Sequence, residues 1–367
     1  MGLDKKIATT LAVAAAVACG AAHASEDYDL RYAPGIGGAD MSAPFEAGWV
    51  FQAPAYVYSG HVSSQLHQPV DLSSSVPGAS ALATIDLRTQ INVQGLLPRL
   101  SFMSDTKFLG AQVGGTALLP VVTKRASTRV TGVSSAVNAP GMPASVISQL
   151  EAGTNAAVTQ GANVSAADNS NEATGIGDLE LSPILRWSTD ASQTLFVLTV
   201  VAPTGDFRAD RAANPGAGRF WTLRPAVQYS YIGDGWDFGG RLAYSINTRD
   251  HATQYRTGNY LNVDATLMKS LNDSTRIGLS GYAVAQTTRD TSQFAGPASA
   301  TDQAGIDEAA RQGVTVDQKG HVYGLGPEVA YIHGAGDYLL EGRFMKEFAG
   351  SYRPQGFTAI VTLSKPF

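Results

Sequence analysis

Residues 220–247 read FWTLRPAVQYSYIGDGWDFGGRLAYSIN. Large apolar side chains stand at alternate positions up to Tyr231, and the same alternation resumes at Trp236 after a Gly-Asp-Gly. A period of two separates the side chains onto the two faces of a strand, whereas a helix would mix them. The stretch therefore predicts two antiparallel strands joined by a tight turn, each with one apolar face and one polar face.

The same alternation recurs along most of the chain. It predicts about twelve strands, an even number, each long enough for a tilted membrane-crossing strand of roughly 9–11 residues. We expect these strands near 47–62, 82–94, 108–122, 176–188, 193–204, 219–232, 236–248, 259–270, 275–288, 320–333, 337–348 and 356–367. In 82–94, the pattern assigns Ile85 and Leu87 to the apolar face and Asp86 and Arg88 to the polar face.

The connections between the strands alternate in length from residue 188 onward. Tight turns such as Gly-Asp-Gly alternate with longer polar loops near 205–218, 248–258, 289–319 and 349–355. This alternation is typical of outer-membrane barrels, whose periplasmic turns are short and whose outer loops are long. One connection, GLLPRLSFMSDTK, is too long for a tight turn.

Two further patterns lead to local expectations. The stretch 123–175 is rich in small and polar residues and contains no aromatic residue, which predicts a mobile or lid-like loop. Pro183, Pro225 and Pro327 each follow a leucine by two residues in a predicted strand. Because proline cannot donate a ladder hydrogen bond, we expect a bulge or bend at each of them.

The N-terminus is typical of an export signal. Lys5 and Lys6 precede an apolar stretch that ends in Ala22-His23-Ala24, a small-x-small cleavage site. We therefore expect a signal peptide at 1–24, an N-terminal periplasmic or lumenal segment at 25–46 and an outer-membrane barrel at 47–367. The one cysteine, Cys19, lies inside the signal, so the mature chain is expected to have neither disulfides nor a thiol nucleophile.

The composition argues against nucleic-acid binding. The chain has 26 Lys and Arg against 31 Asp and Glu, a net charge of −5. This balance provides no basic field for a phosphodiester backbone. No apolar run of about 18 residues follows the signal, so a membrane-spanning form would have to be a closed barrel.

The apolar faces could lie against lipid or against the core of a soluble sandwich. Tryptophan and tyrosine stand near the strand ends, at Trp187, Tyr229, Tyr231, Trp236 and Tyr338, as in the aromatic girdles of membrane barrels. We expect the apolar face to contact lipid. The predicted fold is thus all-β, a transmembrane antiparallel up-and-down barrel in the bacterial outer membrane, surrounded by lipid and lipopolysaccharide.

Several ordered blocks carry a resemblance to a known family. The blocks GIGDLELSPILRWS, VVAPTGDFRADRAANPGAGRFWTLRPAVQYSYI, SINTRDHATQYRTGNYLNVDATL, YGLGPEVAYI and YRPQGFTAIVTLSKPF resemble the exported proteins associated with the meta-pathway of phenol degradation. The resemblance spans nearly the whole mature chain. It implies an outer-membrane barrel that helps small hydrophobic compounds, aromatic ones included, to enter the cell, and it implies no catalytic residues.

The charged residues of the polar faces are candidates for lining the lumen. Their alternative role is to pair across a narrow lumen and fill it. The candidates are Asp86, Arg88, Asp178, Glu180, Arg186, Arg224, Asp237, Arg241, Asp264, Arg276, Glu328, Glu341 and Arg343.

A second group of charges lies in one predicted outer loop. The candidates are Asp206, Arg208, Asp210, Arg211 and Arg219. These arginines suit carboxylates or lipopolysaccharide phosphates, but a loop braced by its own salt bridges explains them as well and is the interpretation we favour.

Three functions remain open on the sequence alone. The first is passive uptake of small hydrophobic compounds, linked to phenol and aromatic degradation. The second is an outer-membrane lipid hydrolase, since His61 and Ser63 are spaced as in some barrel phospholipases, although the third catalytic partner is not evident. The third is a structural or adhesive barrel with a sealed lumen. We expect no enzyme activity and no cofactor. We also expect no metal site, because the histidines lack metal-ligand spacing.

Overall fold

A computed structural model describes residues 30–42, 47–292, 319–334 and 336–367. The predicted signal peptide and most of the 289–319 loop lie outside the described residues. Among the described helices, none has the length and apolar character that crossing a membrane would require.

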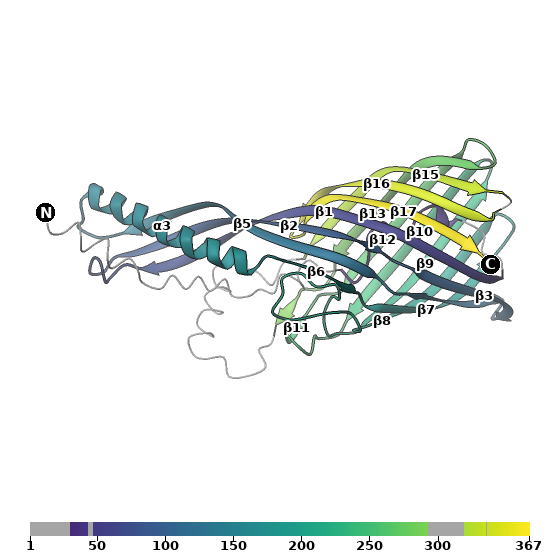
Figure 1. The fold of residues 1–367 in the computed structure, drawn as a ribbon, viewed down its shortest axis with the longest axis horizontal. Helices are drawn as coiled ribbons and strands as arrows, with labels where there is room; N and C mark the ends of the chain where they lie inside the picture. Colours follow the sequence, from purple (N-terminus) through teal and green to yellow (C-terminus); the bar gives the residue numbers. More distant parts are fainter. Residues whose placement is uncertain (1–29, 43–46, 293–318, 335) are drawn as a thin grey trace.

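The described strands close into a twelve-stranded antiparallel barrel, as the sequence predicts (Figure 1). The barrel closes where the last strand pairs with the first, from Val50 opposite Pro366 to His61 opposite Gln355. The strands that cross without interruption are β1 (Gly48–Asp71), β8 (Ser192–Ala202), β9 (Thr222–Gly233), β10 (Trp236–Asn247), β12 (Tyr260–Ser270), β13 (Thr275–Gln286), β15 (His321–His333), β16 (Tyr338–Ser351) and β17 (Gln355–Pro366).

Each of the other crossings is made of two strands that follow one another along the chain. They are β2 (Ser80–Leu96) with β3 (Arg99–Phe108), β4 (Ala111–Leu118) with β5 (Val121–Asn138), and β6 (Asn171–Ile176) with β7 (Leu179–Ser188). A separate two-stranded sheet joins β11 (Tyr255–Arg256) to β14 (Thr291–Ser292).

The alternation of β9 and β10 separates an apolar outer surface from a polar interior. Leu223 and Val227 are 42% and 49% exposed, while Arg224 and Gln228 between them are 4% and 2% exposed. Exposed apolar side chains of this kind continue around the wall. A closed sheet with such a belt and a polar interior is the arrangement that a bilayer requires.

The tight turns lie at the end of the barrel that carries the C-terminus (Figure 1). Asp234 and Gly235, which join β9 to β10, have φ values of 55° and 72°, as a two-residue hairpin turn requires. Leu109 and Gly110 form the equivalent turn between β3 and β4, with φ values of 51° and 78°. The expectation of a long connection at GLLPRLSFMSDTK was therefore wrong, because most of that stretch is strand.

Three strands extend well beyond the other end of the barrel (Figure 1). They are β1, β2 and β5, and helix α3 (Ala144–Asp168) lies along them. Leu150 and Val158 of the helix are 2% and 1% exposed and pack against the alanine, isoleucine and leucine side chains of β2. The prediction of a mobile or lid-like loop at 123–175 was wrong, because its small residues fit a close helix-on-sheet contact.

The prolines of the repeated Leu-x-Pro motif do not create bulges. Pro183, Pro225 and Pro327 lie inside β7, β9 and β15, and the register continues unchanged on both sides of each. The expected bulges were wrong at these positions. The register shifts instead at Asp86, between Met103 and Lys107, and between His321 and Tyr323.

Candidate functional site

The N-terminal residues 30–42 lie inside the barrel and fill part of its lumen. Their one regular element is the short helix η1 (Ala39–Met41), in which every residue is buried. The helix contacts β9, β10 and β12. We call residues 30–42 the plug.

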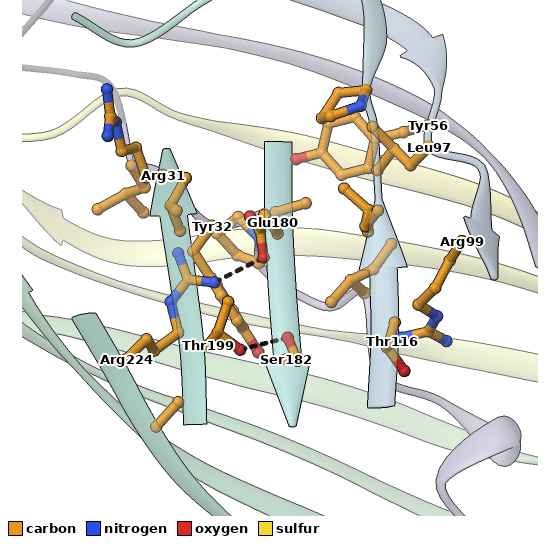
Figure 2. A pocket seen from close by; sticks show the side chains of 18 of the residues that line it. Arg31, Tyr32, Tyr56, Leu97, Arg99, Thr116, Glu180, Ser182, Thr199 and Arg224 are labelled. Carbon is orange, nitrogen blue, oxygen red and sulfur yellow. Dashed lines mark hydrogen bonds and ion pairs between the residues drawn. The ribbon is translucent and has the colours of Figure 1, made fainter. Parts of the chain in front are cut away.

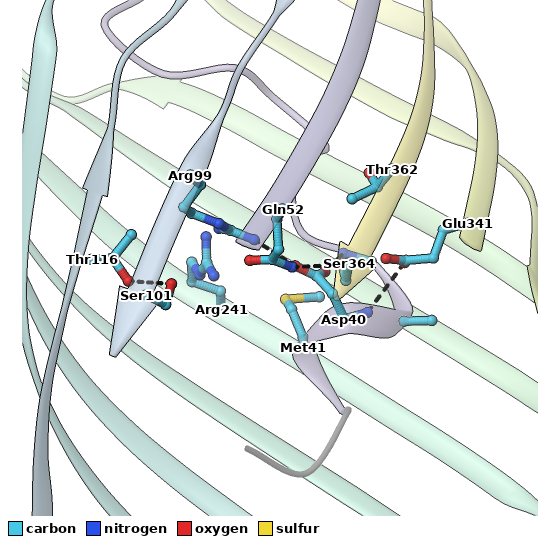
Figure 3. A network of polar contacts seen from close by, with 12 residues as sticks. Asp40, Met41, Gln52, Arg99, Ser101, Thr116, Arg241, Glu341, Thr362 and Ser364 are labelled. Atoms are coloured by element: carbon cyan, nitrogen blue, oxygen red, sulfur yellow. Dashed lines mark hydrogen bonds and ion pairs between the residues drawn. The ribbon is translucent and has the colours of Figure 1, made fainter. Parts of the chain in front are cut away.

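Asp40 is the centre of the contacts at one end of the plug (Figure 3). Its carboxylate pairs with the Arg99 guanidinium at 2.7 Å and accepts hydrogen bonds from the Gln52 side chain at 3.1 Å and the Gly38 amide at 2.9 Å. Burial raises the pKa of Asp40, but the positive charges of Arg99 and Arg343 outweigh it and lower the pKa to about 2. Asp40 is therefore a carboxylate in the lumen at neutral pH.

The backbone of the plug is bound by wall side chains. The amides of Ala39 and Asp40 donate to Glu328 at 2.7 Å and to Glu341 at 3.1 Å. On the opposite wall, Gln193 and Gln228 both donate to the Met41 carbonyl at 3.1 Å. The wall thus satisfies the backbone groups that a non-helical segment would otherwise bury unpaired.

The other end of the plug is held through Arg31 and Tyr32. Arg31 forms an ion pair with Asp178 at 3.2 Å, and its guanidinium lies 3.8 Å from the centre of the Phe220 ring. The Tyr32 hydroxyl donates to Asp264, whose other oxygen accepts from the Gly35 amide at 3.0 Å. Both ends of the plug are therefore fixed by charged wall residues.

A cavity of about 300 Å³ lies between the plug and the wall (Figure 2). Most of its lining is apolar, from the plug and from both sides of the lumen. The apolar lining includes Leu30, Tyr32, Ile36, Tyr56, Ile91, Val93, Leu97, Val122, Ile184, Leu195, Val197, Val201 and Ala226. An apolar cavity of about 150 Å³ holds benzene, so this one has room for a substituted aromatic ring.

The polar groups at the cavity are mostly paired with one another. Arg224 binds Glu180 at 3.0 Å, and Ser182 and Thr199 share a hydrogen bond of 2.8 Å (Figure 2). Paired groups offer little to a charged ligand, because binding it would require these contacts to break. The cavity is suited to an apolar molecule that makes few polar contacts.

Prolines interrupt the hydrogen-bond ladder of neighbouring strands in the wall beside the cavity. Pro54, Pro98 and Pro120 lie in or beside adjacent strands and lack the amide that would donate to the next one. Their carbonyls accept from Leu97 at 2.9 Å, from Leu119 at 3.1 Å and from Gly177 at 2.8 Å. Leu97 and Pro120 also line the cavity. The ladder therefore lacks one amide donor at each of these prolines, close to where Leu97 and Pro120 line the cavity.

The structure places most of the predicted lumen candidates in the interior of the barrel. Several of them hold the plug or pair with one another, and Arg276, for example, pairs with Asp237 at 2.5 Å. The interior set is Asp178, Glu180, Arg186, Arg224, Asp237, Arg241, Asp264, Arg276, Glu328, Glu341 and Arg343.

Asp86 and Arg88 lie elsewhere, and their assignment to the lumen was wrong. Ile85 and Leu87 are 1% and 9% exposed because they face helix α3, which covers the inner face of the extension. Alternate residues of a strand point to opposite faces. Asp86 and Arg88 therefore stand on the outer face of the extension.

The charges of the outer loop brace one another. Arg208 pairs with Asp210 at 2.6 Å and Arg211 with Asp206 at 3.4 Å. The Arg219 side chain donates to the carbonyls of the same loop at 3.2 to 3.3 Å. This arrangement supports the braced-loop interpretation.

No catalytic or metal arrangement is evident in the part of the chain that is described. His61 and Ser63 share the outer face of β1, but no hydrogen bond between their side chains is found among the described residues. The same residues contain no group of three or more histidine, cysteine or carboxylate side chains placed to hold a metal.

Sequence reasoning missed the plug residues Arg31, Tyr32 and Asp40 and the wall residue Arg99. The stretch PGIGGADM, with its glycines and one aspartate, has no period of two and so gave no face on which to place its side chains. Arg99 lies in the stretch that was read as a connection. Their partners are far away in sequence, and no local pattern identifies them.

Comparison with known proteins gives a family and a fold. The profile of the family described as "Putative MetA-pathway of phenol degradation" matches residues 74–363. No curated protein matches the chain in sequence.

Among solved structures, an outer membrane channel from Pseudomonas putida F1 is similar over 92% of this chain and 100% of its own, with 13% identity and a TM-score of 0.56. The CymD monoaromatic hydrocarbon channel, at 10% identity over 88% and 89% of the two chains, has a TM-score of 0.35. A FadL homologue from Pseudomonas aeruginosa, at 8% identity over 86% and 89%, has a TM-score of 0.37. The first likeness shows the barrel fold, and the other two are too distant to add to it.

Proposed function

The chain belongs to the family of proteins associated with phenol degradation, and from this premise we propose that it is an outer-membrane channel for the passive uptake of small hydrophobic compounds, aromatic ones included. Its surroundings are the lipid and lipopolysaccharide of the bacterial outer membrane. The solved structure that shares the barrel fold is an outer membrane channel, which supports a role without catalysis.

One observation carries this proposal, the apolar cavity inside an otherwise polar and plugged lumen. A channel for ions or sugars needs a continuous wet passage with polar walls. Here the polar groups are occupied by the plug and by one another, and the free space of about 300 Å³ is lined mainly by apolar side chains. Such a space favours a molecule that gains free energy by leaving water.

The route out of the cavity is proposed to run sideways through the wall. The axial route meets the plug, which fills part of the lumen and is held at Asp40 and at Arg31. The lateral route meets the wall where Leu97 and Pro120 line the cavity and where successive prolines remove ladder hydrogen bonds. A hydrophobic molecule leaving there would enter lipid directly and would not have to cross a polar lumen.

Filling the cavity tests the proposal. Ala226 is 6% exposed and lines the cavity, while Val227, the next residue on β9, is 49% exposed on the outer surface. We expect Ala226→Trp to reduce uptake of radiolabelled toluene and phenol by whole cells to the level of cells without the gene. Val227→Trp is the matched control and should leave uptake unchanged.

Uptake is also compared between cells with and without the gene. Equal uptake by the two at limiting substrate would contradict the proposal. It would leave the sealed structural barrel as the better account. The amount of each folded variant in the outer membrane is measured in parallel, so that a loss of protein is not read as a loss of transport.

A further inference from the structure

Three cationic side chains and one histidine gather on the outer surface at the base of the extension. We define this outer basic patch as His61 of β1, Arg88 of β2, Arg129 of β5 and Lys346 of β16. The positive charges of Arg88, Arg129 and Lys346 all lie close enough to interact with the His61 ring. All four point away from the lumen, because they alternate with side chains that face the interior or helix α3.

Arg88 and Arg129 stand directly opposite each other in the ladder between β2 and β5. Like charges in directly opposed positions destabilise a sheet. Neither arginine has an ion pair among the described residues. Arg125, four residues before Arg129 on the same face, differs because Glu172 of β6 stands opposite it.

The nearest carboxylate on this face does not resolve the repulsion. Asp86 stands one outward position beyond Arg88, and its oxygen accepts a hydrogen bond from Gln65 at 2.8 Å. No ion pair joins it to Arg88 or Arg129 among the described residues. The arrangement therefore calls for an anion from outside the chain.

The distance of the patch from the apolar belt, along the membrane normal, indicates the kind of anion that it binds. The exposed apolar belt ends on β1 at Val57, and Ser63, the neighbour of Arg88, follows six residues later. At about 3.3 Å per residue this is about 20 Å along the strand, or about 14 Å along the membrane normal for a strand tilted by about 45°. Lys346 is lower, because its partner Phe357 stands opposite Ser59.

The surface directly around Lys346 is aromatic. Phe344 and Phe348 flank it on β16, and the Phe344 ring stacks with Phe357 at 5.5 Å between centroids. Tyr323 stacks with Phe348 at 6.0 Å. Apolar rings with a cation among them, and further cations above, match a molecule that has acyl chains below and phosphates above.

We propose that the outer basic patch binds the phosphates of a lipopolysaccharide molecule of the outer leaflet. Lys346 contacts a phosphate of the lipid anchor, Arg88 and Arg129 together contact a phosphate of the adjoining core sugars, and the rings around Lys346 pack on the acyl chains. The site rests on the proposed outer-membrane location but does not depend on transport. By neutralising the opposed arginines, the glycolipid fixes the extension at its base.

The test uses the full mature protein in detergent and fluorescently labelled rough lipopolysaccharide. We expect Arg88→Gln with Arg129→Gln to weaken binding by about ten-fold or more, because each arginine makes charge-assisted hydrogen bonds to phosphate. Arg125→Gln is the matched control on the same face and should change binding by less than about two-fold. In the absence of lipopolysaccharide, the double variant should unfold at a temperature no lower than the wild type, because a repulsion has been removed.

Several results would overturn the proposal. One is unchanged binding by the double variant, and another is equal wild-type affinity for phosphorylated and dephosphorylated lipopolysaccharide. Displacement of the labelled glycolipid by an equal concentration of inorganic phosphate would show that the patch binds phosphate alone. If Ala226→Trp leaves uptake intact while this binding is confirmed, only the transport proposal is lost.

Discussion

Replacing Asp40 with alanine should open the lumen. Asp40 is held by Arg99 at 2.7 Å and by Gln52 at 3.1 Å. The Arg99 side chain is 13% exposed, so the substitution leaves a buried guanidinium without its carboxylate. The plug then loses its main contact with the wall at this end, while the ladder of the barrel stays intact.

The size of the effect follows from the burial of the pair. Removing one partner of a buried ion pair costs about 3–5 kcal/mol. Each 1.4 kcal/mol corresponds to about ten-fold in an equilibrium constant, so the ratio of plugged to open barrels should fall by about two to three and a half orders of magnitude. The paired variant Asp40→Ala with Arg99→Met removes both charges and should open less than Asp40→Ala alone.

Planar-bilayer conductance measures this directly. The wild type should pass little ion current, and Asp40→Ala should show long openings. Asp210→Ala is the control, because it breaks an exposed pair in which the side chains of Arg208 and Asp210 are 56% and 65% exposed. Surface pairs of this kind contribute about 0–1 kcal/mol. If Asp40→Ala passes no more current than Asp210→Ala, the plug is not held as described here.

Three further outcomes follow from the same structure. The pKa of Asp40 is lowered from 3.8 to about 2, so the ionised carboxylate stabilises the plugged state by about 2 kcal/mol. This stabilisation is fully present above pH 4 and is lost as the pH falls through 2. The ion current of the wild type should therefore stay low from pH 7 to 4 and rise below pH 4. Leu242 is 50% exposed on the apolar belt, and its replacement by arginine should lower the free energy of unfolding by about 2–4 kcal/mol, measured by urea unfolding in vesicles. Leu82 is 47% exposed on the extension, and Leu82→Arg should leave the free energy of unfolding almost unchanged. Val158→Ala should weaken the packing of helix α3 on the extension by about 2 kcal/mol and speed proteolysis of the helix. Val164 is 60% exposed, so Val164→Ala should not change the rate of cleavage. Equal cleavage of the two variants would contradict the packing of the helix.

The sequence predicted the barrel wall better than its contents. From residue 176 onward each strand has one lipid-facing side and one interior side, so Leu223 and Arg224 could be placed by parity alone. Parity separates the faces but does not say what covers them. Ile85 and Leu87 face helix α3, and Ile91 and Val93 face the lumen. The apolar face of this strand is therefore the inner one, which is why Asp86 and Arg88 were assigned to the wrong side.

The plug and the cavity could not be predicted for a different reason. Asp40, Arg99 and Glu341 come together only when the barrel closes, and their separations in sequence are large. Helix α3 was missed because its alanines, serines and threonines resemble a polar loop in composition. Its buried side chains, such as Leu150 and Val158, are too few and too small to give a clear apolar stripe.

The central claim is that the apolar face of the barrel lies against acyl chains. All 4 tryptophans of the chain test it, since Trp49, Trp187, Trp221 and Trp236 lie on the outer surface with exposures of 39% to 46%. Refolded in vesicles whose lipids carry brominated acyl chains, the mature protein should lose most of its tryptophan fluorescence. Unquenched fluorescence, from a chain that also stays monodisperse in buffer without detergent, would contradict the barrel's place in the membrane.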